Sequence, residues 1–336
     1  MARFVPPSPT RRNALGIAAM ASLNLLLPAA AARADTARTR PGASPLSAPG
    51  TPWRKGLRLR HGTVMQSFAF DEAHRCLYAL QVVEGGVRLR GEKRPYTHDE
   101  RARHGDLCLN RLDLHGTLTG HMYLKGFGHG GAMGVERHGA GSRLWTEWDA
   151  GPASGYGRGI CRFRFADGHV LTRSSSRLTT YHPVPGSTSN SVTLDQGRRR
   201  LLLRYKLQGS PRFAVYDLAR FGTRRARPLA DFAQPDADLG LPFQGMALDG
   251  STLYQLMGSG YGPFDPPEFG GTIYLGRTNW RTGTSHRVFP ERTAPHLRPR
   301  EPEGLGVRHS DGRLYFGLTQ GTTGDRRFSL YAKTVR

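Results

Sequence analysis

Short runs in which apolar and small or polar residues alternate recur along the chain, and each is followed by a polar turn and a second apolar run. The pattern occurs in "QSFAFDEAHRCLYALQ" from Gln66, "GAMGVERHGAGSRLWTEW" from Gly131, "NSVTLDQGRRRLLLRY" from Asn190, "QGMALDGSTLYQLM" from Gln244 and "EGLGVRHSDGRLYFGL" from Glu303. The starts are separated by 65, 59, 54 and 59 residues. Alternation with a period of two, ending in a turn rich in Gly, Asp and Arg, indicates a β-hairpin. The sequence therefore predicts five hairpins at a regular interval.

Most hairpins are followed by a third run rich in β-branched and aromatic residues, which is typical of a further strand. These runs are "DLCLNRLDL", "GICRFRFAD", "RFAVYDLAR", "TIYLGRTNW" and "FSLYAKTVR". No stretch shows a long helical apolar period with caps, so we expect few helices. Repeats of this length, built from three or four antiparallel strands, predict an all-β, five-bladed β-propeller whose chain ends complete one blade together. A large β-sandwich is the alternative, but it does not require equal spacing.

The N-terminus has the features of an export signal. Two arginines in "TRRNAL" directly precede the run "ALGIAAMASLNLLLPAAAA", and Ala32-Arg33-Ala34 gives a small-residue cleavage pattern. The apolar run is too short and too rich in alanine for a membrane span, and the twin arginines predict the Tat route, with an ordinary Sec signal as the alternative. We predict a Tat-type signal peptide over 1–34, a flexible linker over 35–52, and a single β-propeller domain over 53–336 of a secreted, cell-wall-associated protein.

The charge of the chain narrows the class of partner. Residues 1–34 contain four arginines and no acidic residue, so their removal lowers the formal charge from +22 to +18. Such a surface favours polyanions, and outside a cell the most available are acidic envelope polymers. Only five of the 48 basic residues are lysine, so arginine enrichment also reflects the codon bias of a high-GC genome. We expect an anionic cell-envelope polymer or polysaccharide as the partner, no nucleic acid as a physiological partner, and a monomer.

Three cysteines, Cys76, Cys108 and Cys161, allow at most one internal disulfide and leave one thiol. Whether Cys76 and Cys108 pair stays open. None shows the C-x-x-C spacing of a structural zinc site, and we predict neither a metal nor a cofactor.

The residues that head the five hairpins form the candidate site. In a propeller the innermost strand of each blade runs beside the central channel, so these residues should meet at its mouth. A ring of polar side chains around such a cup suits a ligand, whereas the alternative is that they bond to each other and to trapped water. With Arg204 near a strand end and Tyr261 in the Gly/Pro-rich loop 259–271, the predicted ligand-binding residues are Gln66, His129, Asn190, Arg204, Gln244, Tyr261 and Glu303.

Two stretches suggest chemistry at this cup. His129 and His138 should lie at opposite ends of one strand and cannot share a metal, and "GFGHGG" neither follows a strand nor opens a helix as a dinucleotide loop does. His129 suits a hydrogen bond to a sugar hydroxyl or a general base, with a structural histidine as the alternative. In "REPEGL", Glu301 and Glu303 share one side of an extended strand and can divide acid and base roles, unless Arg300 neutralises them.

Several of these phrases resemble a known family. They are "QSFAFD", "GDLCLNRLDLHGTLTGHMYLKGFGHG", "LWTEWDA", "FQGMAL", "REPEGLGV" and "GDRRFSLY". They are similar to the secreted propellers called teichoic acid biosynthesis protein C, a propeller also used by receptor-binding proteins of some staphylococcal phages. The resemblance covers the chain from about Val64 to Lys333 and implies a five-bladed propeller associated with cell-wall glycopolymers. It carries no catalytic signature that transfers residue by residue.

The sequence therefore predicts an exported propeller that binds cell-wall or extracellular glycopolymers, teichoic-acid-like or acidic polysaccharide, through a polar axial cup. The alternative is a glycan-cleaving enzyme, a polysaccharide lyase or glycoside hydrolase, with His129, Glu301 and Glu303 as catalytic groups. A third class is a scaffold whose cup is closed by its own side chains.

Overall fold

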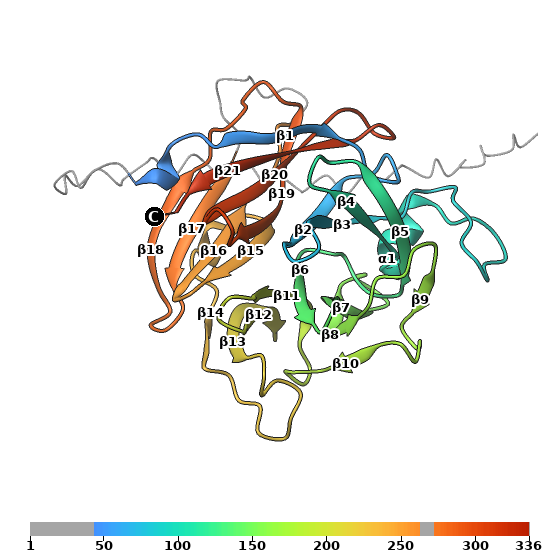
Figure 1. The fold of residues 1–336 in the computed structure, drawn as a ribbon, viewed down its shortest axis with the longest axis horizontal. Helices are drawn as coiled ribbons and strands as arrows, with labels where there is room; N and C mark the ends of the chain where they lie inside the picture. Colours follow the sequence, from blue (N-terminus) through green and yellow to red (C-terminus); the bar gives the residue numbers. More distant parts are fainter. Residues whose placement is uncertain (1–43, 263–271, 336) are drawn as a thin grey trace, which may run out of the picture. The chain divides into compact units, whose positions relative to one another are not determined.

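Five sheets of mostly antiparallel strands surround one axis in the computed structural model, which describes residues 44–262 and 272–335 (Figure 1). The five-bladed β-propeller predicted from the repeat is confirmed, and each repeated hairpin supplies the two innermost strands of one blade. The predicted signal peptide and the first part of the predicted linker lie outside the described residues.

The blades follow one another along the chain, and within each blade the strands are ordered from the axis outward. Blade 1 comprises β2 (Met65–Asp71), β3 (Cys76–Val82), β4 (Leu107–Asp113), β5 (Leu118–Lys125) and, parallel to β5, β9 (Val170–Thr172). Blade 2 comprises β6 (Met133–His138), β7 (Gly141–Ala150), β8 (Gly157–Phe163) and β10 (Thr179–Tyr181). Blade 3 comprises β11 (Thr188–Asp195), β12 (Arg200–Leu207), β13 (Ser210–Asp217) and β14 (Ala230–Ala233). Blade 4 comprises β15 (Phe243–Asp249), β16 (Thr252–Met257), β17 (Tyr274–Asn279) and β18 (Thr284–Pro290). Blade 5 comprises β19 (Pro299–Arg308), β20 (Arg313–Gln320), β21 (Arg327–Thr334) and β1 (Thr51–Leu57). The helical segments are η1 (Pro45–Ser47), α1 (His98–His104) and η2 (Ala237–Leu239).

The two ends of the chain complete blade 5 together, as the repeat predicts. β1 pairs antiparallel with β21, which would otherwise be an open sheet edge. The domain start predicted at residue 53 therefore falls inside β1, and η1 before it buries Leu46 (2% exposed). Lys333 fastens this segment, because its Nζ donates to the Leu46 carbonyl (3.1 Å) and pairs with Glu291 (2.7 Å). From Ser44 onward, the segment predicted to be a linker packs against the propeller.

The apolar residues form a core between each pair of neighbouring blades. Strand β2 shows why the inner strands alternate apolar and small residues: Phe68 and Phe70 pack against blade 5, whereas Ala69 packs against blade 2. Both faces of a blade are therefore buried, and a small residue permits close approach on one of them. This double burial explains the "SFAF" phrase and its repeats better than a half-exposed strand, which would alternate apolar and polar residues.

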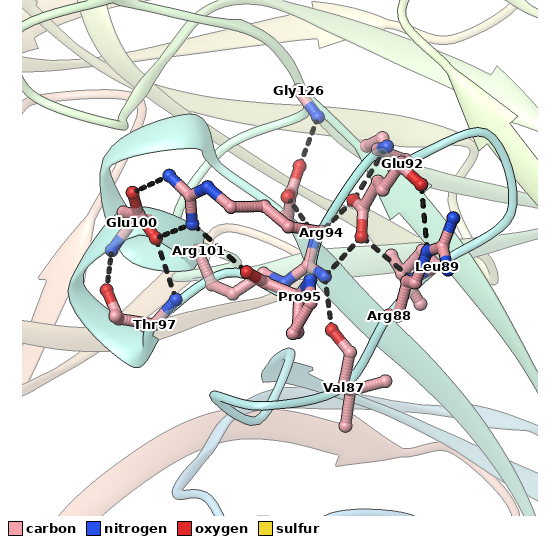
Figure 2. A network of polar contacts seen from close by, with 12 residues as sticks. Val87, Arg88, Leu89, Glu92, Arg94, Pro95, Thr97, Glu100, Arg101 and Gly126 are labelled. Atoms are coloured by element: carbon pink, nitrogen blue, oxygen red, sulfur yellow. Dashed lines mark hydrogen bonds and ion pairs between the residues drawn. The ribbon is translucent and has the colours of Figure 1, made fainter.

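A long connection between β3 and β4, residues 83–106, is held to blade 1 by a buried ionic network (Figure 2). The network centres on Arg101 of α1, whose side chain is fully buried. Arg101 Nη1 lies 2.5 Å from Glu92 Oε1 and 2.8 Å from Asp106 Oδ2, and Lys125 Nζ lies 2.7 Å from Glu92 Oε1. Burial would raise the pKa of Glu92, but the bonds from Arg101 and Lys125 outweigh it and lower that pKa to about 2.

Within the described residues, no helix has the length and apolar character that a membrane crossing needs. The three cysteines, Cys76, Cys108 and Cys161, are all buried and carry free thiols, so the pairing that the sequence left open does not form in this structure. Burial raises the pKa of all three, to about 11 for Cys76.

Candidate functional site

The N-terminal ends of the five innermost strands lie together at one end of the propeller axis, a region that we call the cup. Ring contacts and electrostatic interactions link a group of side chains there: His129, Glu147, Tyr156, Arg204, Glu301 and Glu303. Gln66 and Gln244 lie near the starts of β2 and β15 at the same end. Neighbouring blades are joined there directly: the Ser67 hydroxyl donates to the Gly130 carbonyl at 2.6 Å, and a Cβ on Gly131 would lie 3.4 Å from Ser191 Oγ. The N-terminal ends of β2, β6 and β11 are therefore neighbours.

The glycine-rich stretch before β6 wraps around the carboxylate of Glu147, which sequence reasoning did not assign to the site. Glu147 is 1% exposed and accepts bonds from the backbone N–H groups of Gly130 (2.5 Å), Gly131 (3.2 Å) and Gly157 (2.7 Å). A Cβ on Gly128 would lie 2.1 Å from Glu147 Oε2, so only glycine fits there. Burial raises the pKa of Glu147 although the three bonds favour the carboxylate. The glycines thus build a cradle for a buried acid.

Tyr156 stands over this cradle and is the second cup residue that the sequence did not reveal. It lies in the connection between β7 and β8, and its ring is tilted by 31° against the imidazole of His129 at a centroid distance of 4.7 Å. It is 39% exposed, an unusual degree for a large aromatic residue in this molecule. Burial raises the pKa of its phenol, the carboxylates of Glu147 and Glu303 add to the shift, and the Arg204 guanidinium opposes it. These charges therefore share one site with Tyr156.

Arg204 and Glu303 are both buried, at 8% and 4% exposure, and neither has a counter-ion within 4 Å among residues 44–262 and 272–335. Arg204 Nε donates to Gln234 Oε1 at 2.8 Å, and its Cζ lies 4.1 Å from the centroid of the Phe243 ring. Burial lowers the pKa of Arg204 to about 10, and burial together with the neighbouring Glu301 raises the pKa of Glu303 well above its ordinary value. Buried ionisable groups normally have an ion-pair partner, so two such groups without one make this region the candidate site.

Three other predicted site residues, Asn190, Gln244 and Tyr261, make contacts within the protein itself. The Asn190 side chain is fully buried and bonds to Ser187 and the Gly157 carbonyl, so it is inaccessible to a ligand in this structure. Gln244 Nε2 donates to the Gly258 carbonyl at 2.9 Å. Tyr261 is 7% exposed beneath Arg298, whose Cζ lies 4.0 Å from its ring centroid, and the predicted loop beyond it lies outside the described residues from residue 263 to 271.

The two histidines of the glycine-rich stretch are separated as expected, since β6 runs between His129 and His138. In the described part of the chain, no group of three or more His, Cys, Asp or Glu side chains is arranged to hold a metal ion. The cup instead offers carboxylates that accept bonds from hydroxyl groups, a guanidinium that donates to oxygen atoms, and an exposed aromatic ring.

We expect His129 and His61 to contribute a loss of stability as the pH falls from about 6.5 to about 4, while Glu147, Glu301 and Glu303, whose pKa values are raised, contribute in the opposite direction. Burial lowers the pKa of His129 from 6.5 to about 4, and burial and the Arg60 charge do the same for His61. In this window the two histidines bind protons in the unfolded chain but not in the folded protein, so acid favours unfolding by roughly 3 kcal/mol per histidine. In urea unfolding, the free energy of unfolding of wild type should fall by roughly 3 kcal/mol more than that of His129→Asn between about pH 6.5 and about pH 4. His138→Asn is the control, and an unchanged slope in His129→Asn contradicts the assignment.

Comparison with known proteins yields a family and a set of relatives. A family model described as the phage 5-bladed beta propeller receptor binding platform domain matches residues 64–264. A Bacillus subtilis (strain 168) protein that carries the name major teichoic acid biosynthesis protein C is 27% identical over 206 residues. That alignment covers 60% of this chain and 43% of the relative, so this chain spans less than half of that protein.

Solved structures share the fold. The tail fiber of Staphylococcus aureus phage P68 superimposes with a TM-score of 0.65 at 20% identity, over 85% of this chain and 53% of that one. The GH43_1 enzyme from Xanthomonas citri complexed with xylose gives a TM-score of 0.43 at 11% identity, over 83% and 90% of the two chains, which is too low to carry an argument about catalysis.

Proposed function

The chain belongs to the family of phage five-bladed β-propeller receptor-binding platform domains, and from this premise we propose that it binds a glycopolymer of the bacterial cell envelope through the cup. Its relatives support the class of ligand, because the family is named for receptor binding and the Bacillus subtilis protein is named for teichoic acid biosynthesis. We further propose that the chain is exported by the Tat route and acts outside the cell, since two arginines precede the apolar run of residues 14–32.

One observation carries the proposal: Arg204 and Glu303 are both more than nine-tenths buried in the cup, and neither forms an ion pair within 4 Å among the described residues. Such an arrangement costs stability in the free protein, and a ligand that bonds to both groups offsets the cost. Between a donor and an acceptor of this kind, the exposed ring of Tyr156 provides a face on which a sugar ring packs.

The charge of the cup indicates which part of a glycopolymer it binds. Glu147, Glu301 and Glu303 bring three carboxyl groups, and burial raises the pKa of each. Arg204 is the buried cation beside them. A site with this excess of acidic groups suits hydroxyl groups better than a chain of phosphates, so the cup should recognise the sugar of the repeating unit.

Retention on purified polymers tests this function. Wild-type protein should bind wall teichoic acid or an acidic polysaccharide, and Tyr156→Ala should weaken the affinity by about thirtyfold, the effect of truncating a central aromatic contact of about 2 kcal/mol. Tyr156→Phe keeps the ring and serves as the control, with most of the affinity retained. Retention of no polymer at all contradicts the proposed function.

Cleavage of the same glycan is a second candidate, favoured by the raised pKa of both Glu301 and Glu303, which lie two residues apart in β19. A raised pKa lets a carboxyl group keep its proton to a higher pH, which is what a general acid requires. The incubations above should therefore be assayed for new reducing ends and for unsaturated ends. Product that disappears in Glu303→Gln supports a hydrolase or a lyase, and retention without product supports binding alone.

A further inference from the structure

The connection between β13 and β14 displays an unusual run of positive charge. Residues 218–229 contain four arginines, Arg220, Arg224, Arg225 and Arg227, and no acidic residue. All four are exposed, and none forms an ion pair with another described residue. Two arginines on the strands of this blade are, by contrast, paired: Arg200 with Asp217 at 2.8 Å and Arg212 with Asp231 at 2.8 Å. We call residues 218–229 the arginine loop.

The arginine loop is anchored, so its charges are presented from an ordered backbone. Phe221 packs against Trp145, Tyr181 and Tyr216, with ring centroids 5.8, 5.1 and 5.1 Å away. The Asp217 carboxylate accepts bonds from the N–H groups of Ala219 (3.0 Å) and Arg220 (3.2 Å). Two successive turns follow, closed by bonds from Thr223 N to the Arg220 carbonyl (3.2 Å) and from Ala226 N to the Thr223 carbonyl (3.0 Å). Preorganisation of this kind lowers the entropy cost of binding.

The loop leaves the propeller on the face opposite the cup. Asp217, where β13 ends, pairs across the sheet with Arg200, and Arg200 pairs with Asp195 at the end of innermost strand β11. The cup lies at the other end of β11, beside Asn190. In Figure 1 the loop projects from blade 3 between β13 and β14. A ligand in the cup therefore leaves the arginine loop free.

We propose that the arginine loop is a second binding site, which takes the phosphodiester backbone of an anionic envelope polymer. The planar fork of arginine matches phosphate oxygens, and several unpaired arginines on one segment suit a ligand with repeated charges. This surface contributes four positive charges with no acid among them, whereas the carboxyl groups of the cup outnumber its buried arginine. The choice of a phosphodiester polymer rests on the proposed function, whereas anion binding by the loop does not.

A lipid surface fits the loop less well. Binding within a bilayer interface needs apolar side chains that insert, and Leu229 (48% exposed) is the exposed large apolar residue of this segment. Phe221, the aromatic residue of the loop, is used in the anchor. Because a polymer repeats its unit, the cup and the arginine loop can hold separate stretches of one chain or neighbouring chains, which strengthens attachment to a wall.

The test compares two variants of equal charge change in the full mature protein. The loop variant carries Arg220→Gln, Arg224→Gln, Arg225→Gln and Arg227→Gln. The control variant carries Arg90→Gln, Arg164→Gln, Arg177→Gln and Arg292→Gln, which replace exposed arginines of other connections that form no ion pair with any described residue. The probe is poly(glycerol phosphate) without sugar substituents, so that the cup contributes little. Unfolding curves confirm that both variants are folded.

We expect the loop variant to bind this polymer about tenfold more weakly at low salt, with a shallower salt dependence, and the control to stay within about twofold of wild type. Equal losses in both variants would show an effect of net charge alone and overturn the proposal, as would no loss in either. Loop-dependent binding that is as strong to polygalacturonate, or to vesicles containing phosphatidylglycerol, overturns the choice of a phosphodiester polymer. Failure of the cup is distinguishable, because Tyr156→Ala should leave binding of this unsubstituted polymer unchanged.

Discussion

Replacement of Arg101 by methionine is expected to lower the free energy of unfolding by about 3–5 kcal/mol. The substitution removes a fully buried guanidinium and leaves Glu92, 5% exposed, and Asp106, 2% exposed, facing each other without it. Lys125 stays beside Glu92 but lies 2.7 Å from one carboxylate oxygen and cannot replace a bidentate partner for both acids. Urea unfolding of wild type and variant at neutral pH measures the difference.

Arg94→Met is the matched control in the same connection (Figure 2). Arg94 pairs with Glu100 at 2.6 Å, but its side chain is 59% exposed, so its loss should leave stability close to that of wild type. The pKa of Glu92, lowered to about 2, adds an acid test: the stabilisation by the network is complete above about 4.5 and is lost as the pH falls toward about 2. Equal stability of the two variants contradicts a structural role for the network.

Glu147→Ala is expected to destabilise the protein by at least about 3 kcal/mol. It removes the acceptor for three backbone N–H groups, those of Gly130, Gly131 and Gly157, and each buried donor left without a partner costs about 1–3 kcal/mol. The cradle would then lose the contact that places His129 under Tyr156, so polymer binding should fall together with stability. Thermal or urea unfolding and retention on the polymer measure the two effects.

Two further variants test whether the lost hydrogen bonds cause the destabilisation in Glu147→Ala. Glu147→Gln keeps one carbonyl acceptor and should lose roughly half as much stability as the alanine variant. Glu84→Ala removes a partly exposed acid whose His61 contact is 3.6 Å long, and it should change the free energy of unfolding by less than about 0.5 kcal/mol. A Glu147→Ala protein as stable as Glu84→Ala would show that the N–H groups find other partners.

The architecture is readable from the sequence because the pattern repeats at the scale of one blade. In the run "SFAF", Phe68 and Phe70 are buried against one neighbouring blade and Ala69 against the other. Each repeat must likewise bury both faces of its inner strand, so the same alternation recurs. The predicted start of the domain at residue 53 falls too late in the chain. Residues 44–52 have no apolar period, so the sequence alone does not show that they belong to the fold. Their order depends on the edge of β21, which lies far away in the sequence.

Only some of the residues of the cup could be predicted from the sequence. His129 and Glu303 head inner strands, so position in the repeat identifies them, whereas Glu147 and Tyr156 belong to the end of β7 and the connection after it. Their signals are local: glycines that approach an acid, and a tyrosine between glycines in "SGYGRG". Neither signal identifies a site residue until the fold is known. Asn190 is the opposite case. Its position near the start of an inner strand predicts a site residue, but its side chain forms hydrogen bonds within the protein.

The central claim is that the cup is the glycopolymer site, and a crystal structure of the mature protein with an oligomer of the bound polymer tests it most directly. We predict a sugar unit against the ring of Tyr156, with a hydroxyl group bonded to Glu303 and an oxygen atom bonded to Arg204. An oligomer bound elsewhere on the propeller, with the cup unoccupied at a ligand concentration that saturates retention, would contradict it.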